Sequence, residues 1–250
     1  MSDWQVLPRL LLLVGFCALS SCASTLGDIA PYESPEDAIR EWDTAEPLLI
    51  AVSPIAPALD IAVELFNPGI SEEDRSPLAA VRRLESQLLA GELRETLVRS
   101  NQWGVVRLLP SASSLTPVSI RTGIVVSDGR DLVLNVVVKD AMGALWFEDT
   151  VAYRQQSAGE DGLEGIFNAL ANRLLSVWQG KDRDERYALL QGADIAYAEA
   201  LAPEAFSGMI QRSQTDWRVI RLPAEDDPML ARIERIRNQE YLFCDTIDEQ

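Results

Sequence analysis

Residues 118–153 constrain the fold more than any other part of this 250-residue chain. Two runs rich in β-branched residues, 118–126 and 132–138, flank an Asp-Gly pair. Such a pair between two apolar runs is typical of a β-hairpin, because both residues tolerate the positive φ of a tight turn. A second turn leads into a third run at 145–153. The sequence therefore predicts an antiparallel meander of three strands.

The third strand of this meander assigns its side chains to two faces by alternation. Leu145, Phe147, Val151 and Tyr153 share one face, and we expect that face to pack against a helix. Trp146 falls on the other face and leaves two interpretations open. It is either an exposed tryptophan, of the kind enriched in binding hot spots, or a core residue covered by the helices that follow in the chain.

The strongest helical pattern in the chain covers residues 77–99. Ser76 can cap the helix, and Pro77 suits its first position because proline has no N–H to leave unpaired there. A continuous apolar stripe at helical spacing predicts that this helix packs along the sheet. The stripe consists of Val81, Leu84, Leu88, Leu89, Leu93 and Leu97.

Shorter patterns complete the expected order of elements. Apolar runs bounded by turn residues predict strands at 47–54, 61–66, 103–109 and 217–222. Helical spacing and capping residues predict helices at 35–43, 162–179, 184–201, 204–211 and 228–243. The fold class is therefore α/β (α+β), with a mixed sheet that contains the meander. We expect the long amphipathic helix on one face of that sheet and the C-terminal helices on the other.

The first residues of the chain predict an export signal. The apolar run 10–19 has the length of a signal-peptide core and falls short of the roughly 20 residues that span a bilayer. Small residues at Ser20 and Ser21 precede Cys22. This pattern resembles the lipobox of bacterial lipoproteins, which implies that Cys22 carries a thioether-linked diacylglyceryl group and becomes the acylated first residue. The alternative is an ordinary signal peptide with Cys22 as a plain thiol.

The lipoprotein resemblance also implies a location. Ala23 follows the cysteine where lipoproteins kept in the inner membrane often carry Asp, so we expect the periplasmic face of the outer membrane. Each buried methylene contributes about 0.8 kcal/mol, so two or more acyl chains make the attachment lasting. The expected layout is a signal peptide at 1–21, a tether at 22–46, an α/β domain at 47–153 and a mainly helical region at 154–250 packed on it.

A second resemblance rests on the order of elements and on turn residues within Gly123–Gly129 and Asp140–Phe147. Residues 59–153 resemble the small α/β domain of periplasmic lipoproteins such as activators of penicillin-binding proteins, the curli-secretion lipoprotein and the N-terminal domain of the Tol-system translocation protein. The resemblance implies a non-catalytic binding domain. It carries over no functional residue, because members of that group act through different surfaces.

Residue types limit the chemistry of the chain. It contains no histidine, which removes the common nucleophile activators, HExxH zinc sites and the usual general base near neutral pH. Cys244, the one cysteine beyond Cys22, is a poor nucleophile without an imidazole partner. We therefore expect no catalytic, cofactor or metal site. Carboxylates remain as the alternative, because paired acids can hydrolyse glycan. The candidates are Glu148-Asp149, Glu160-Asp161 and Glu225-Asp226-Asp227.

Charge limits the partners. The chain carries 22 basic and 39 acidic residues, a net charge of −17, so we expect no binding to nucleic acid. Candidate partner-binding residues are Trp146 with Arg232 and Arg235, although the arginines also suit a solvated helix face paired with nearby glutamates. The favoured function is a non-enzymatic accessory lipoprotein for an envelope complex. The alternatives are a carboxylate-dependent hydrolase of envelope glycan and a structural lipoprotein that self-associates through the sheet edge or Cys244.

Overall fold

The computed structural model describes residues 39–40, 42, 44–110, 115–154, 162–213, 216–224 and 226–248. All of them belong to one compact unit. The expected signal peptide, Cys22 and most of the expected tether lie outside the described residues. Within the described part of the chain, no helix is both long and apolar enough to cross a membrane.

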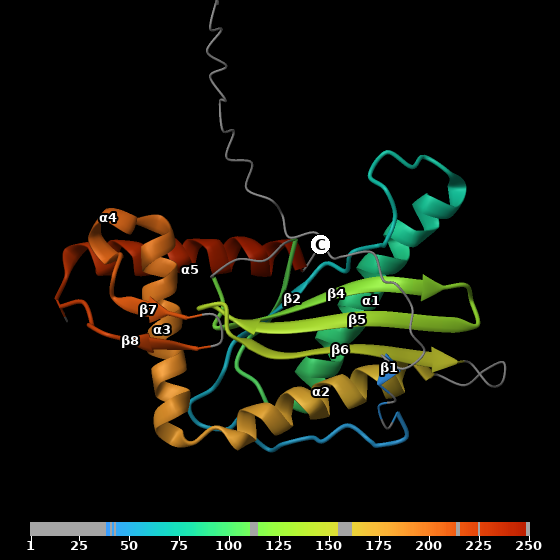
Figure 1. Ribbon diagram of the computed structural model, residues 1–250, viewed down its shortest axis with the longest axis horizontal. Helices are drawn as coiled ribbons and strands as arrows, with labels where there is room; N and C mark the ends of the chain where they lie inside the picture. The colour runs from blue at the N-terminus through green and yellow to red at the C-terminus, as the bar shows by residue number, and fades with distance from the viewer. Residues whose placement is uncertain are drawn as a thin grey trace, which may run out of the picture. The chain divides into compact units, whose positions relative to one another are not determined.

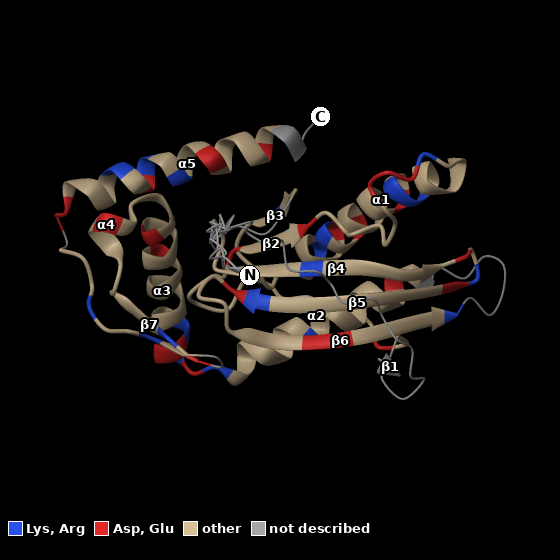
Figure 2. Ribbon diagram, turned by 45° about the horizontal axis from the view of Figure 1, so that its top comes forward, with Lys and Arg blue, Asp and Glu red and all other residues tan. Residues whose placement is uncertain are grey.

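A six-stranded mixed sheet forms the centre of the fold, with strand order β1-β6-β5-β4-β2-β3 (Figures 1 and 2). The strands are β1 Ile39–Arg40, β2 Ile61–Glu64, β3 Val106–Leu109, β4 Val118–Ser127, β5 Asp131–Asp140 and β6 Leu145–Arg154. The predicted meander is present, because β5 pairs antiparallel with both β4 and β6. The other pairs are parallel: β1 with β6, and β2 with both β3 and β4. The predicted mixed α/β class is confirmed.

Five helices and a small hairpin complete the described residues. The helices are α1 Pro77–Ser100, α2 Gly162–Gly180, α3 Arg183–Leu201, α4 Pro203–Phe206 and α5 Pro228–Asp248. The hairpin pairs β7 Ile210–Arg212 with β8 Trp217–Val219. Two predicted helices were wrong in part: residues 39–40 form β1, and the helix predicted at 204–211 ends at Phe206, because the chain pairs with β8 from residue 210 onward.

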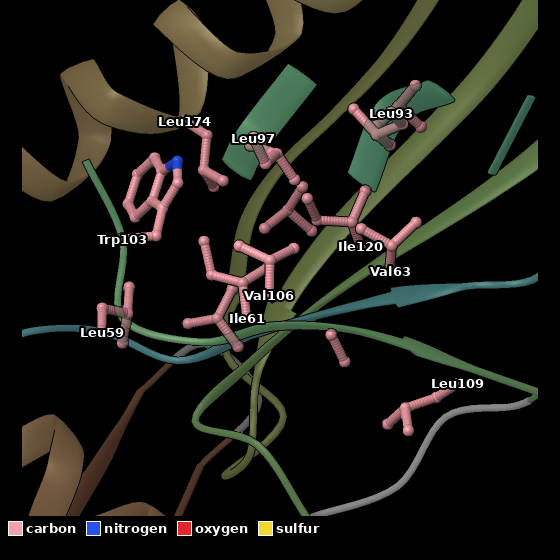
Figure 3. Close-up of a cluster of buried hydrophobic side chains, with 14 of the residues drawn as sticks. Leu59, Ile61, Val63, Leu93, Leu97, Trp103, Val106, Leu109, Ile120 and Leu174 are labelled. Carbon is pink, nitrogen blue, oxygen red and sulfur yellow. The ribbon is translucent and has the colours of Figure 1, made fainter. Parts of the chain in front are cut away.

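Helices α1 and α2 pack against each other and share one face of the sheet. Figure 3 shows Leu93 and Leu97 of α1 and Leu174 of α2 in one cluster with Val63 and Ile120 of the strands. All five side chains are fully buried. This placement corrects the prediction for α2, which we expected on the opposite face. Helix α2 lies on this face because it packs against α1, and the periodicity within one segment does not encode such a contact.

Helix α5 does lie on the opposite face, over β3. Arg107 of β3 points away from Val106 and reaches α5, where its Nε donates to Asp245 Oδ1 at 2.9 Å. Its guanidinium carbon also lies 3.8 Å from the centre of the Tyr241 ring. Arg107 is 5% exposed, so α5 seals this part of the sheet with a charged and aromatic contact.

Helix α1 buries only the second half of its predicted stripe. Leu89, Leu93 and Leu97 are buried, whereas Leu84 and Leu88 are 68% and 63% exposed. Val81 and Leu78 are also exposed. The same half of α1 still buries Ala79 and Ser86, and Arg82 Nη2 donates to the Ser127 carbonyl of β4 at 2.8 Å. The exposed side chains therefore lie on the face of α1 that points away from the sheet, although the start of the helix rises beyond the β4 edge in both ribbon views (Figures 1 and 2). The prediction that the whole stripe packs on the sheet was therefore wrong for its first half.

The segment predicted as a strand at 47–54 forms none. Its backbone is bonded by side chains instead: Leu49 N–H donates to Asn172 Oδ1 at 3.0 Å, and Asn172 Nδ2 donates to the Pro47 carbonyl at 3.0 Å. Gln102 Nε2 donates to the Leu49 carbonyl at 3.1 Å. These amides replace a strand ladder, which explains how an apolar, strand-like sequence runs as an extended strap across α2.

Candidate binding groove

A groove of about 740 Å³ opens between the start of β6 and the β8 segment, and we call it the β6–β8 groove. The C-terminal end of α2 and the N-terminal half of α3 form its floor. Its walls come from segments far apart in the sequence, so only the tertiary fold creates it. The residues that line it are Asp140, Ala144, Leu145, Trp146, Val177, Lys181, Glu185, Ala188, Leu189, Gln191 and residues 216–222.

A buried carboxylate joins the two walls of the groove. Trp217 Nε1 donates to Asp140 Oδ2 at 3.0 Å. The other oxygen of Asp140 accepts the backbone N–H groups of Met142 and Ala144, each at 3.0 Å. Asp140 is 7% exposed. Its side chain therefore closes the β5–β6 turn and holds the hairpin strand β8 against the sheet.

A glycine in α3 allows this contact. A Cβ atom on Gly192 would lie 3.0 Å from the Trp217 ring and 3.1 Å from the Met142 sulfur. These distances are shorter than ordinary carbon contacts, so a side chain at this position would require Trp217 or Met142 to shift by a few tenths of an ångström. The close packing of Trp217 and Met142 thus explains why α3 carries a glycine here, although glycine has a low helical propensity.

The environment of Asp140 sets its protonation. Burial raises the pKa of the Asp140 carboxyl above its ordinary value of 3.8, although hydrogen bonds from Trp217, Ala144 and Met142 and the charge of Lys181 act in the opposite direction. Both carboxyl oxygens are engaged by N–H donors within the protein. The geometry is therefore that of a structural anchor and leaves no oxygen of Asp140 unpaired for proton transfer to a ligand.

Trp146 stacks on α2. Its ring and that of Trp178 have centres 6.2 Å apart and planes 12° apart. The Nζ of Lys181 lies 5.2 Å from the centre of the Trp146 ring, within cation–π range. Trp146 is half-buried, and its indole N–H makes no hydrogen bond within the described residues. It therefore combines features of both predicted interpretations, since it packs on a helix and also lines the groove.

A register shift in the sheet explains this position. Val138 pairs with Phe147, but the next residue, Lys139, pairs with Leu145, so Trp146 has no partner residue opposite it in β5. The extra residue reverses the alternation before Phe147. The prediction that Leu145 shares a face with Phe147 was therefore wrong: Leu145 is 52% exposed at the groove, and Phe147 is buried.

The groove combines an apolar rim with separate charges. Leu145, Ile220 and Leu222 are each more than half exposed at its edge. Lys181, Arg218 and Arg221 bring positive charge to the groove, and Glu185 and Asp216 bring negative charge. Apolar walls with a few polar groups are typical of a site that binds a ligand or a peptide.

The other predicted partner-binding residues lie elsewhere. Arg232 and Arg235 are exposed on α5 and do not line the β6–β8 groove. Figure 2 shows acidic and basic residues interleaved along α5. Cys244 is half-buried and lines a smaller cavity of about 420 Å³ between β3 and α5.

The predicted carboxylate candidates form no pair among the described residues. Glu148 is exposed, whereas Asp149 is buried with Oδ2 3.7 Å from Arg173 Nε, so the two point to opposite faces as adjacent strand residues should. Asp227 accepts the Met229 N–H at the start of α5. Glu160, Asp161 and Glu225 lie outside the described residues. Within the described ranges, no group of three or more metal-ligating side chains gathers.

Sequence reasoning missed Trp217 and Asp140 as a site. Two signals pointed toward them. Asp140 opens a tight turn, where a carboxylate commonly bonds backbone N–H groups two and four residues on. Gly192 interrupts an otherwise favourable helix, which indicates close packing of another segment.

Comparisons with known proteins establish no family. No protein-family model matches the sequence, and no curated protein matches it either. A dodecamer of a PelC variant from Paraburkholderia phytofirmans is similar, with 15% identity, 52% of this chain and 96% of that chain covered, and a TM-score of 0.34. A Xanthomonas campestris protein of family-model DUF330 is also similar, with 10% identity, 56% and 94% covered, and a TM-score of 0.28. TM-scores this low do not establish a shared fold, so the resemblance of residues 59–153 stays a prediction.

Proposed function

We propose that this chain is a lipid-anchored protein of the bacterial envelope that binds a protein partner through the β6–β8 groove and catalyses no reaction. The observation that carries the proposal is the groove itself. It exposes Leu145, Ile220 and Leu222 beside a half-buried tryptophan, while its buried carboxylate is engaged by N–H donors. Exposed apolar side chains that meet at a concave site favour association over catalysis.

The proposed cellular location of the protein rests on the lipobox pattern. Acylation at Cys22 would fix the chain to a membrane, and Ala23 favours the periplasmic face of the outer membrane. Residues 1–21 would be removed as the signal peptide. The tether expected at 22–46 would end before Ile39, because Ile39 and Arg40 pair with β6 in the sheet. A protein partner of the envelope, such as a cell-wall synthase or a secretion complex, fits this location.

Trp146 is the central partner-binding residue in this proposal. Its ring is already ordered by Trp178 and Lys181, so a partner would bind a rigid aromatic surface at little cost in conformational entropy. A partner large enough to reach α5 would also meet Arg232 and Arg235.

Site-specific photo-crosslinking tests the proposal. A photoreactive amino acid replaces Leu145 in the groove, and in a matched control it replaces Val52, which is fully exposed on the strap. We expect a discrete adduct with one envelope protein from position 145 and none from position 52. The Cys22→Ala variant should lose both membrane attachment and the adduct. Equal crosslinking from both positions, or none from position 145, would contradict partner binding at the groove.

Carboxylate catalysis is the second candidate, and the raised pKa of Asp140 is the observation that favours it. Glu185 and Asp216 also line the groove, but Glu185 Oε2 accepts the Asp182 N–H at the start of α3, and Asp216 Oδ1 accepts the Trp217 N–H. All three carboxylates thus have structural roles, which places this candidate behind binding. If the protein cleaves envelope glycan and Glu185→Gln abolishes the cleavage, hydrolysis would replace partner binding as the favoured function.

Self-association is the third candidate, favoured by the exposed stripe on α1. Leu78, Val81, Leu84 and Leu88 are spaced three and four residues apart and are each at least 60% exposed. That spacing suits pairing with a second α1 helix. Sedimentation velocity of the mature protein tests this candidate: a monomer at all concentrations would exclude it, and a dimer that Leu84→Glu dissociates would support it.

A further inference from the structure

We propose that the β6–β8 groove takes an extended peptide segment of its partner, which adds to the outer edge of β8 as a third strand. The inference rests on the proposed function, because it names the form in which a partner would bind the same groove. It is carried by the hydrogen-bond pattern of the hairpin and by the sequence of residues that line the groove.

The hairpin pattern shows which main-chain groups point outward. Ile220 N–H donates to the Met209 carbonyl at 2.8 Å, and Ser213 N–H donates to the Asp216 carbonyl at 2.8 Å. Opposed residues in an antiparallel pair alternate between bonded and non-bonded positions. The Gln211–Arg218 pair therefore bonds inward, and the main-chain groups of Trp217 and Val219 point away from β7.

The outer edge of β8 pairs with no strand in the part of the chain that is described. The Trp217 N–H donates to Oδ1 of the preceding residue, Asp216, at 2.7 Å. The N–H and carbonyl of Val219 and the carbonyl of Trp217 are thus the main-chain groups that this edge offers. Seven consecutive residues, 216–222, line the groove. A strand that presented one face would contribute alternate residues, so an unbroken run indicates that the backbone edge itself borders the groove.

The opposite wall indicates the side chains that such a peptide would carry. Trp146, Val177 and Ala188 form an apolar surface across the groove from β8. A strand laid between them would turn every second side chain toward that surface, so alternate apolar residues suit it. Arg218 and Arg221 beside the edge favour an acidic residue in the same peptide, whereas Glu185 and Asp216, which also line the groove, favour a basic residue where the peptide passes them. A third strand also stabilises a two-stranded hairpin, which is marginal by itself.

Peptide selection followed by a backbone-directed variant tests the inference. Random heptapeptides displayed on phage are selected against the mature protein in detergent micelles, and an enriched sequence is synthesised as the probe. Val219→Pro removes the outward N–H without disturbing the inward bonds, because proline is tolerated on strand edges. We expect Val219→Pro to weaken probe binding about tenfold, the effect of roughly one hydrogen bond, while the matched Val219→Ala changes it less than about threefold.

Hydrogen exchange gives a readout that does not depend on the variant's folding. The Val219 amide of the unmodified protein should exchange at least about tenfold more slowly once the probe is bound, since one hydrogen bond then protects it. Failure to enrich any peptide, or an unprotected Val219 amide in the bound state, would overturn strand addition. If crosslinking from position 145 persists while these tests fail, the partner site stands and only the strand mode falls. If crosslinking from position 145 also fails, the proposed function falls with it.

Discussion

At the scale of single residues, buried charge joins the parts of this fold. Arg107 bonds Asp245 of α5 and stacks on Tyr241, and its Nη1 lies 3.4 Å from Asp60 Oδ2. Asp140 does the same for the hairpin through Trp217. In both cases a charged side chain on the sheet contacts an element from the C-terminal region. Hydrophobic packing supplies most of the surface buried in these contacts, and the paired charges fix the orientation of the two elements.

Removal of Arg107 should destabilise the protein. Arg107→Ala leaves a gap under Tyr241 and deprives half-exposed Asp245 of its donor, so we expect a loss of about 2 kcal/mol in the free energy of unfolding. Urea denaturation measures this loss. Arg235→Ala is the control, because Arg235 is exposed on α5, and it should change stability by less than about 0.5 kcal/mol. Equal effects of the two variants would refute the role of Arg107.

The titration of Asp140 should report its contact with Trp217. The pKa of Asp140 lies above 3.8, so the folded state holds this proton more tightly than the unfolded state does. The stability that Asp140 contributes is therefore present in full below pH 3.8 and is lost as the pH rises through the raised pKa. Trp217→Phe removes a hydrogen bond to the ionised form, so we expect the pKa to rise further.

Carboxyl carbon shifts of Asp140, followed by NMR across acidic pH, measure that change. The control is Trp103→Phe, a buried tryptophan remote from Asp140 in the hydrogen-bond pattern. It should leave the Asp140 titration where it is. An Asp140 pKa that stays constant in Trp217→Phe would mean that the indole N–H does not stabilise the carboxylate.

At the scale of elements, α1 separates what a local pattern can predict from what it cannot. Its start was predicted from Ser76, whose side chain accepts the Ala79 N–H at 3.2 Å, because capping depends on neighbours in the sequence. Its end at Asn101, with φ of 50°, is likewise local. Which of its leucines are buried depends on the face of the helix that the sheet and α2 cover, and that is not encoded in the helix itself.

Two leucines in α1 should therefore respond differently to the same substitution. Leu93 is fully buried, so Leu93→Ala should cost about 2–5 kcal/mol in the free energy of unfolding. Leu84 is 68% exposed, so Leu84→Ala should cost less than about 0.5 kcal/mol in the monomer. Thermal and urea unfolding at low protein concentration measure both. A large loss in Leu84→Ala would show that the N-terminal half of α1 is covered in solution.

At the scale of the whole molecule, the net charge of −17 opposes the compact state through like-charge repulsion. Local ion pairs such as Arg154–Asp131 and Arg212–Glu199 act in the opposite direction. Their exposed members contribute little individually. The balance should therefore depend on salt.

We expect the melting temperature of the mature protein to rise when sodium chloride increases from about 10 mM to about 150 mM. Over that range the screening length falls from about 30 Å to about 8 Å, so long-range repulsion weakens more than short ion pairs do. Differential scanning calorimetry at constant pH measures the shift. A melting temperature that falls with salt would mean that ion pairs outweigh the repulsion.

The sequence by itself determined the mixed α/β class, the meander, the capped helices and the absence of histidine chemistry. Each of these depends on residue type or on spacing within one segment. Its expectations for Cys22, Trp146, Arg232 and Arg235 stay predictions.

Only the tertiary structure decided which helices share a face, where the stripe of α1 emerges and how Trp146 meets Trp178. It alone brings Asp140 beside Trp217, residues 77 positions apart in the chain. A periodic pattern records that a side chain prefers burial, but the partner that buries it is chosen by packing between distant segments.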